Sequence, residues 1–149
     1  MSNTVEASSE TSIHQSVGYW AGLLARSMEA EFSRRLEPHG LTRMSYAVLG
    51  AIVFDGCTKP SEVADFLRVD RGAVTRLMDK LAKQGLIERS TGALDRRSVS
   101  ITVKPEGVGL AKELQRHSRA VNDLFTAHLK PEDADKFVDL VKAMLANSE

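Results

Sequence analysis

Residues 68–97 constrain the fold of this chain more than any other stretch, because they combine an amphipathic helix with a hairpin. Apolar side chains recur at intervals of three and four residues from Val74 to Leu81, which predicts a helix that buries one stripe. Asp70 can cap the start of this helix, because its carboxylate can accept from the free amides of the first turn. Gly85 can end it, because glycine accepts a left-handed backbone.

Two short segments after this helix have the composition of paired strands. Leu86–Ser90 and Ser98–Val103 flank a polar connection, and the second segment alternates apolar and polar side chains, as strands with one buried face do. The connection ends in the basic tip Asp95-Arg96-Arg97. A presented helix followed by such a hairpin indicates a winged helix-turn-helix. The predicted fold class is therefore mainly α with a small β-hairpin wing.

Positive charge gathers in the same stretch. It holds eight Lys and Arg against four Asp and Glu, a net charge of +4, whereas the whole chain has 20 of each kind and is neutral. A local basic surface on a projecting helix and hairpin is expected for a protein that contacts a phosphate backbone. Charge alone leaves a second interpretation open, namely a charged face that is simply solvated.

Length and composition bound the class of protein. A chain of 149 residues can bury a core of its own. No apolar run approaches the ~20 residues that cross a membrane, and the polar start MSNTVEASSE lacks the pattern of a secretion signal. We therefore expect a cytoplasmic protein with no membrane partner, in which residues 1–11 form a disordered leader.

Catalytic, cofactor and metal motifs do not stand out. The chain has no Gly-x-Ser-x-Gly, no Gly-rich phosphate loop and no His-Glu-x-x-His, so neither an enzyme nor a bound cofactor is expected. His117 and His128 are 11 residues apart, about three helical turns, which is too far for the two to chelate one metal ion. No metal site is expected.

Cys57 is the single cysteine, which excludes an intramolecular disulfide and a multi-cysteine zinc site. A redox role for its thiol needs an exposed, electropositive setting, and nearby Lys59 alone offers positive charge. An inert thiol is the favoured interpretation, and a redox-responsive regulator is the alternative.

Long amphipathic helices are expected on both sides of the winged segment. The first runs from Thr11 or Ser12 to about Leu36, and its apolar positions cover more than one face. Its first half is therefore expected to lie in a subunit interface. Three prolines that each follow a lysine predict further helix starts, because proline at the first helical position loses no hydrogen bond. These are Pro60, Pro105 and Pro131.

The expected domain organisation has two parts. Residues 12–38 and 107–149 would form a helical dimerisation region, which includes helices over Gly107–Leu129 and Glu132–Ala146. Residues 39–106 would form the winged helix-turn-helix DNA-binding domain.

Two helices are expected before the presented helix. Thr42 is predicted to cap the first, with Met44 among its inward residues, and Pro60–Leu67 forms the second. A brief turn at Arg68 and Val69 then leads to the presented helix. Such turns often hold glycine, so mild backbone strain is predicted at Arg68.

Taken in order, these segments resemble the MarR family of bacterial transcriptional regulators, from about Ser12 to the end of the chain. Each motif alone is weak, whereas their order and spacing together are specific. Two departures from the family pattern are Lys59 and Lys104, which stand where polar helix caps are usual. The motifs that carry the resemblance are Gly40-Leu41-Thr42, Glu62-Val63-Ala64, Arg71-Gly72-Ala73-Val74-Thr75-Arg76-Leu77 with Leu81, Gln84-Gly85-Leu86-Ile87-Glu88-Arg89, Asp95-Arg96-Arg97-Ser98 and Pro105-Glu106-Gly107.

The resemblance implies a homodimer on a pseudo-palindromic double-stranded DNA site, with half-sites about one helical turn, ~34 Å, apart. The helix from Asp70 to Gln84 would enter the major groove, and Arg97 would reach into the minor groove. Asp95 would brace the wing arginines, and Ser61 would donate to a phosphate. The residues expected to contact DNA or to position those contacts are Ser61, Arg71, Gly72, Thr75, Arg76, Lys80, Lys83, Arg89, Asp95, Arg96 and Arg97.

The resemblance also places any effector in a cleft between the dimer helices and the winged domain. Tyr19, Trp20, Arg43 and Tyr46 are the candidates, and aromatic rings with one cation suit a small aromatic acid. A purely structural role in the core is the alternative for Trp20 and Tyr46. The expected function is a sequence-specific, homodimeric repressor that a small effector releases from DNA. The alternative is a winged-helix dimer that binds a protein partner.

Overall fold

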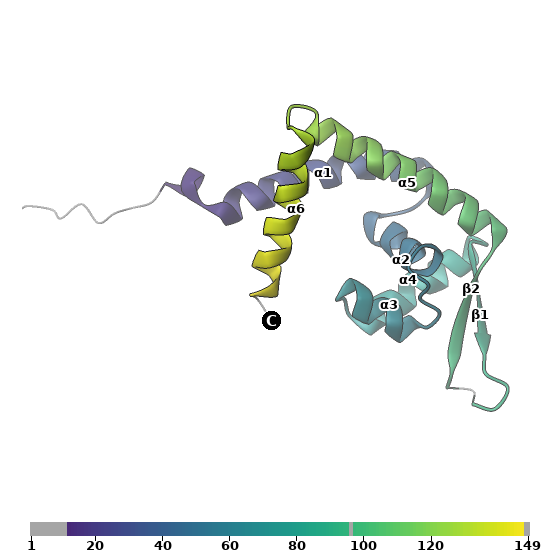
Figure 1. Cartoon of the computed structure of the whole chain (residues 1–149). Coiled ribbons are helices and arrows are strands. Elements are labelled where there is room, and N and C mark those ends of the chain that lie inside the picture. The colour runs from purple at the N-terminus through teal and green to yellow at the C-terminus, as the bar shows by residue number, and fades with distance from the viewer. Residues whose placement is uncertain (1–11, 96, 148–149) are drawn as a thin grey trace, which may run out of the picture.

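The computed structural model describes residues 12–95 and 97–147, and Figure 1 shows their arrangement. Helices α1 and α5 lie against each other, and α2, α3 and α4 gather on one side of this pair. A two-stranded hairpin projects from the α2–α4 unit on the side away from α1. In chain order the elements are η1 (Ile13–Gln15), α1 (Val17–Leu36), η2 (Glu37–His39), α2 (Arg43–Val53), α3 (Pro60–Leu67), α4 (Arg71–Lys83), β1 (Ile87–Thr91), β2 (Val99–Val103), α5 (Pro105–Thr126) and α6 (Pro131–Ala146).

Helix α1 begins later than the sequence predicted. Ser16 is extended, with φ −77° and ψ 122°, and its hydroxyl accepts from the Tyr19 amide at 3.3 Å. A serine cap therefore separates the short turn η1 from α1, whereas the apolar period had suggested one unbroken helix from Thr11 or Ser12. Thr11 and the expected disordered leader lie outside the described residues.

The predicted helix starts are confirmed. Pro60, Pro105 and Pro131 are the first residues of α3, α5 and α6. The Asp70 carboxylate accepts from the Ala73 amide at 2.9 Å and so caps α4. Thr42 caps α2 in the same way, by accepting from the Ser45 amide at 3.2 Å. Local capping chemistry thus sets where these helices begin.

The turn between α3 and α4 is left-handed at Arg68, where mild backbone strain was predicted. Arg68 has φ 54° and ψ 47°, and it is the only described residue other than glycine with a positive φ. A side chain at such a position costs about 1 kcal/mol relative to glycine. This turn brings α4 across α3, which completes the helix-turn-helix unit.

The hairpin has the predicted inward and outward pattern. Strands β1 and β2 are antiparallel, with Arg89 opposite Ile101 and Ile87 opposite Val103. Ile101 is buried, whereas Ser100 and Thr102 face solvent. The Ile101 amide also donates to the carbonyl of Thr58 at 2.7 Å, so β2 is tied to the loop that precedes α3.

One apolar core runs through all of these elements except η1, η2 and α6. Side chains from α1, α2, α3, α4, the hairpin and α5 form it, and the innermost are Leu36, Leu49, Val63, Val74, Met78, Leu81, Ile87 and Leu114. Met44, which was predicted to face inward, is instead 37% exposed, and it lies in the first turn of α2.

The start of α5 lies very close to the backbone at the base of the hairpin. An added Cβ at Gly107 would lie 2.1 Å from the carbonyl oxygen of Leu86, so only glycine fits. The same carbonyl accepts from the Lys104 amide at 3.0 Å. This contact seats the first turn of α5 directly on the junction between α4 and β1.

We predict that Gly107→Ala destabilises the fold by ~2 kcal/mol or more, because the methyl group must push helix and hairpin backbone apart. Urea unfolding measures the loss. Gly109→Ala is the matched control, because nothing lies within 4 Å of a Cβ at that position. The control should be neutral or stabilising, since alanine is the better helix former. Equal stability of the two variants would contradict the described contact.

Candidate nucleic-acid interface

Helix α4 presents a polar and mainly cationic face opposite its buried stripe. Val74, Met78 and Leu81 are buried, while Arg71, Gly72, Arg76, Lys80 and Lys83 are exposed and Thr75 is half-buried. The helical period of about 100° per residue places the two sets on opposite sides. The basic face of α4 is therefore exposed to solvent, while the opposite face packs into the core.

Several of these side chains already have local partners. The Thr75 hydroxyl donates to the Arg71 carbonyl at 3.0 Å, and the Arg71 guanidinium lies 3.8 Å from Asp65. Both charged side chains of that pair are more than 70% exposed, so the ion pair is weak and easily exchanged for another anion. A Cβ added at Gly72 would lie 2.9 Å from the Asp70 carboxylate that caps α4 and 3.6 Å from the Arg76 guanidinium, so glycine leaves the cap and Arg76 undisturbed.

Arg89 joins the hairpin to α4. Its guanidinium forms a hydrogen-bonded ion pair with Asp79, and the Arg89 side chain is only 29% exposed. Asp79 lies one turn from Arg76 on α4, so the hairpin leaves the helix beside its cationic face. Arg89 thus has a positioning contact inside the protein.

Near the hairpin tip, Asp95 accepts from the backbone amide of Arg97 at 2.9 Å. The sequence suggested that Asp95 braces the wing arginines, and the contact described is with backbone, which fixes the turn beneath the Arg97 side chain. Arg97 itself is exposed. Arg96 lies outside the described residues. Leu94 is fully exposed near the tip, and nothing in the structure explains it.

Ser61 lies half-buried in the first turn of α3, where free backbone amides favour an anion. Lys59 offers no side-chain cap to α3, yet backbone amides at the start of this helix do have a hydrogen-bond acceptor. Glu62 reaches back and accepts from the amides of Thr58 at 2.8 Å and Lys59 at 3.2 Å. The bond from the Thr58 amide is the main reason why the pKa of Glu62 is lowered.

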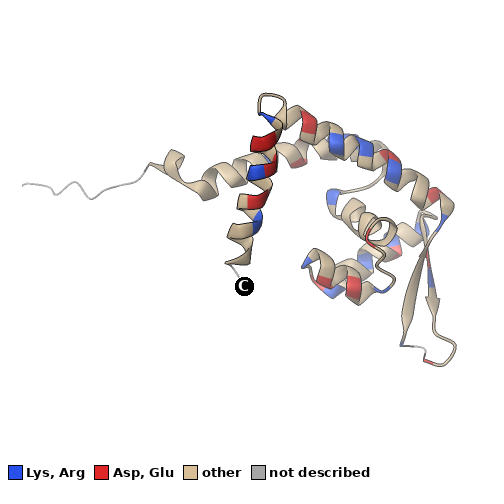
Figure 2. Cartoon of the chain, viewed as in Figure 1, with Lys and Arg blue, Asp and Glu red and all other residues tan. Residues whose placement is uncertain are grey.

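Charge is unevenly distributed over the elements. Figure 2 shows blue Lys and Arg segments on the α3–α4 unit, at the hairpin and along α5, whereas red acidic turns stand out on α6. In the sequence, residues 131–149 hold five acidic residues and two lysines, and the three basic residues of α5 are matched by three acidic ones. The excess of positive charge therefore lies in residues 68–97, in a chain with no net charge.

A cavity of about 660 Å³ lies between α1, α2, α5 and α6. Of the four effector candidates, Arg43 and Tyr46 line it. Burial raises the pKa of Tyr46, against the opposing effects of a hydrogen bond with Ser118 and the charge of Arg119. The cavity wall is mostly apolar, with Arg43 and Glu29 as its two charged residues.

Tyr19 and Trp20 are not among the residues that line this cavity. They lie at the start of α1, where their rings make an edge contact at 5.2 Å and both approach His14. The Trp20 indole donates to the His14 carbonyl at 2.6 Å, yet the side chain is 51% exposed. The exposure of Trp20 contradicts the alternative of a core position, whereas a role for Tyr19 and Trp20 in effector binding stays a prediction.

Cys57 is buried, at 8% exposure, which disfavours reagents that need contact with the sulfur. Burial raises the pKa of the Cys57 thiol, and the nearby charges of Glu62 and Asp55 raise it further. A raised pKa means less thiolate at neutral pH, and the thiolate is the reactive species. Both observations support the interpretation of an inert thiol.

One group of side chains was not assembled from the sequence. His39, Glu113 and His117 place ligand atoms within 4.8 Å of one another. The sequence analysis considered His117 together with His128, which is 11 residues away. Glu113 is four residues from His117, and this spacing places the two side chains next to each other on α5.

Among the described helices, none has the length and apolar character to span a membrane.

Comparison with known proteins agrees with the geometry. Helix α4 beside a projecting hairpin defines the class of winged helix-turn-helix proteins. The sequence model of the MarR family matches residues 39–98. The multiple antibiotic resistance protein MarR of Salmonella typhimurium is 35% identical over 105 residues, which cover 70% of this chain and 72% of that protein. This chain belongs to the MarR family, and it is a DNA-binding transcriptional regulator rather than an enzyme.

Solved structures share the fold. The MepR–DNA complex of S. aureus has a TM-score of 0.79 and 21% identity, and the match covers 89% of this chain and 98% of that one. A cysteine-to-serine variant of E. coli MarR, crystallised with operator DNA, has a TM-score of 0.77 and 24% identity over 86% of this chain and 92% of that one. The predicted fold class, mainly helical with a hairpin wing, is confirmed.

We predict that Glu62→Gln lowers the melting temperature by a few degrees at pH 7, because the charged carboxylate is the better acceptor for the Thr58 and Lys59 amides. A carboxyl group whose pKa is lowered by folding stabilises above its ordinary pKa and ceases to do so as pH falls through its folded pKa. The difference between parent and variant should therefore close in acid.

Thermal unfolding followed by circular dichroism between pH 7 and pH 3 measures this effect. Glu88→Gln is the control, since it removes the charge of an exposed glutamate on β1. A constant difference between Glu62→Gln and the parent across this pH range would contradict the assigned role of the carboxylate.

Proposed function

We propose that this chain is a homodimeric repressor that binds a pseudo-palindromic operator and is released by a small effector. The observation that supports this most directly is the ion pair between Arg89 and Asp79. It holds the hairpin beside the cationic face of α4, so one rigid unit carries both. Such a unit can present a helix to the major groove and a wing to the adjacent minor groove.

The proposed DNA contacts are with bases, with the phosphate backbone and with the minor groove, and a further set of residues positions these contacts. Arg71, Thr75 and Arg76 lie toward the N-terminal half of the exposed α4 face and are assigned to bases and nearby phosphates. Lys80 and Lys83 lie farther along α4 and are assigned to the phosphate backbone, as is Ser61 at the start of α3.

Arg97 is assigned to the minor groove, together with Arg96 of the wing motif. Gly72, Arg89 and Asp95 are assigned positioning roles, because they support Arg76, the hairpin base and the Arg97 turn.

A second copy of the chain is the proposed partner of the exposed apolar band. Helix α6 has no buried residue in this protomer, and Phe137, Leu140 and Met144 are each about half exposed. At the other end of the chain, Val17 is 62% exposed and Trp20 51%. Apolar surface on this scale is unusual for a monomer and marks an interface. The helix-turn-helix and the hairpin together, from α2 to β2, form the winged unit. Two-fold pairing through the apolar band would also supply the two winged units that a palindromic site requires.

The cavity beside α2 is the proposed effector site. Its apolar wall, with Arg43 and Tyr46 as polar groups, suits a small aromatic acid. A ligand there would contact α1, α2, α5 and α6 at once, so its affinity can depend on how the winged unit sits on the long helices. Such a difference in affinity is what release from DNA requires. Adding small aromatic acids to an operator-binding assay tests this assignment.

We predict that Arg76→Ala weakens operator binding by tenfold or more and reduces the preference for operator over unrelated DNA. Lys83→Ala should weaken both DNAs to a similar, smaller extent and reduce the salt dependence by about one phosphate contact. Fluorescence anisotropy at several salt concentrations, with the DNA upstream of the chain's own gene, measures both. Binding equal to the parent in both variants would contradict the assigned orientation of α4. A flat salt profile would instead favour a protein partner for the winged unit.

We predict that Leu140→Glu dissociates the dimer, because it places a charge in the apolar band. Leu140 is 54% exposed in the protomer, so the fold of each chain should survive. Light scattering after size-exclusion chromatography measures the mass, and Lys142→Gln is the control with the same change in net charge. A parent chain that is monomeric at micromolar concentration would contradict the proposed homodimer.

A further inference from the structure

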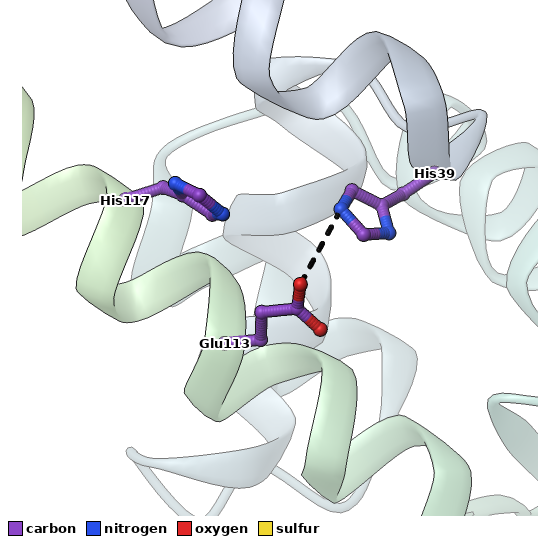
Figure 3. Close-up of side chains that lie close together, drawn as sticks. All are labelled: His39, Glu113 and His117. Atoms are coloured by element: carbon purple, nitrogen blue, oxygen red, sulfur yellow. Dashed lines mark ion pairs between the residues drawn. The ribbon is translucent and has the colours of Figure 1, made fainter.

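We propose that His39, Glu113 and His117 form a binding site for a transition-metal ion, with Zn²⁺ as the ion it fits best. The three side chains come from two elements that are far apart in the sequence, η2 and α5. Figure 3 shows the His39 ring on one side, with the Glu113 carboxylate and the His117 ring directed toward it from α5. The ligand atoms of the three lie within 4.8 Å of one another.

The distances between the ligand atoms are close to those expected around a bound zinc ion. His39 Nε2 and Glu113 Oε1 are 3.8 Å apart, which is too long for a hydrogen bond. Ligand atoms ~2.1 Å from a tetrahedral zinc ion are about 3.4 Å apart. Closing the group around an ion therefore needs shifts of about 1 Å or less per side chain. Glu113 is 45% exposed at its side chain, so it has room to make such a shift.

The placement on α5 is that of a chelating pair. Glu113 and His117 are separated by four residues, so they lie on one face of the helix, one turn apart. Leu114, between them in sequence, is fully buried and fixes the rotation of that face. His117 has no hydrogen bond or ion pair with any other residue that the structure describes. Its ring nitrogens are therefore available to a ligand.

The set of donors selects the class of ion. Two imidazole nitrogens and one carboxylate oxygen favour zinc and its neighbours in the first transition row over Mg²⁺ or Ca²⁺, which prefer oxygen ligands throughout. Three protein ligands leave one tetrahedral position for water. All three side chains are partly exposed, so an ion can reach them from solvent.

The location gives the ion a mechanical role. His39 is the last residue of η2, which connects α1 to α2, and Gly40 follows it with φ 66°. A bound ion would tie this corner to the middle of α5 by coordinate bonds, where the described protein has a single weak ion pair. The corner is where the chain passes from the long helix α1 into the winged unit, so the ion would restrain the connection between the two.

Calorimetric titration of the untagged full chain, stripped with EDTA and dialysed, tests the proposal. We expect one Zn²⁺ per chain with micromolar or tighter affinity, no binding of Mg²⁺, and a melting temperature several degrees higher in zinc. Co²⁺ in place of Zn²⁺ should give the visible absorption of a four-coordinate site. This spectrum reports ligand geometry independently of any variant.

His39→Gln, Glu113→Gln and His117→Gln, made singly, should each weaken zinc binding at least tenfold and leave the melting temperature in EDTA close to that of the parent. His128→Gln is the control, because His128 is exposed and lies beyond the end of α5, roughly 16 Å from His117 along the helix direction. Absence of saturable zinc binding by the parent would overturn the proposal. So would binding that survives all three substitutions or is lost in the control.

Discussion

The fold depends on one close backbone contact, between Gly107 at the start of α5 and the carbonyl of Leu86 at the base of the hairpin. Because that carbonyl also accepts from the Lys104 amide, the end of β2 and the start of α5 are fixed to one point. The orientation of the hairpin relative to the long helix follows from this contact. Helix α4 follows too, since Leu86 comes directly after the turn that ends it. The glycine in the motif Pro105-Glu106-Gly107 is thus required by space rather than by a special backbone angle.

Electrostatics in the winged unit serves two different purposes. Arg89 is directed inward to Asp79, and Asp95 is directed to the backbone of Arg97, so these charges set geometry. Arg76, Lys80 and Lys83 are exposed and have no ion pair with another described residue, so their charge is available to a polyanion. Counting charge along the sequence treats both groups alike. The +4 of residues 68–97 therefore overstates the number of cations free to meet phosphate.

Features set by short-range chemistry were predictable from the sequence. Asp70, Thr42 and the three Lys-Pro starts defined helices, and the alternation in β2 defined the buried face of the hairpin. The resemblance to a family supplied the expected homodimer and the expected groove contacts, which no local pattern could. A long-range contact was missed, because His117 was compared with another histidine on the same predicted helix instead of with His39. Contacts between distant segments are decided by packing angles, which the period of a helix does not encode.

The contacts described between the hairpin and the rest of the protein lie between its base and the middle of its strands. Its anchors are the Arg89–Asp79 ion pair, the bond from the Ile101 amide to Thr58 and the seat at Leu86. Five strand residues extend about 17 Å, so a rotation of about 10° at the base would carry the end through ~3 Å. That displacement is half of the ~6 Å width of a minor groove. The position of the tip is therefore decided by backbone and side-chain contacts that lie well away from it.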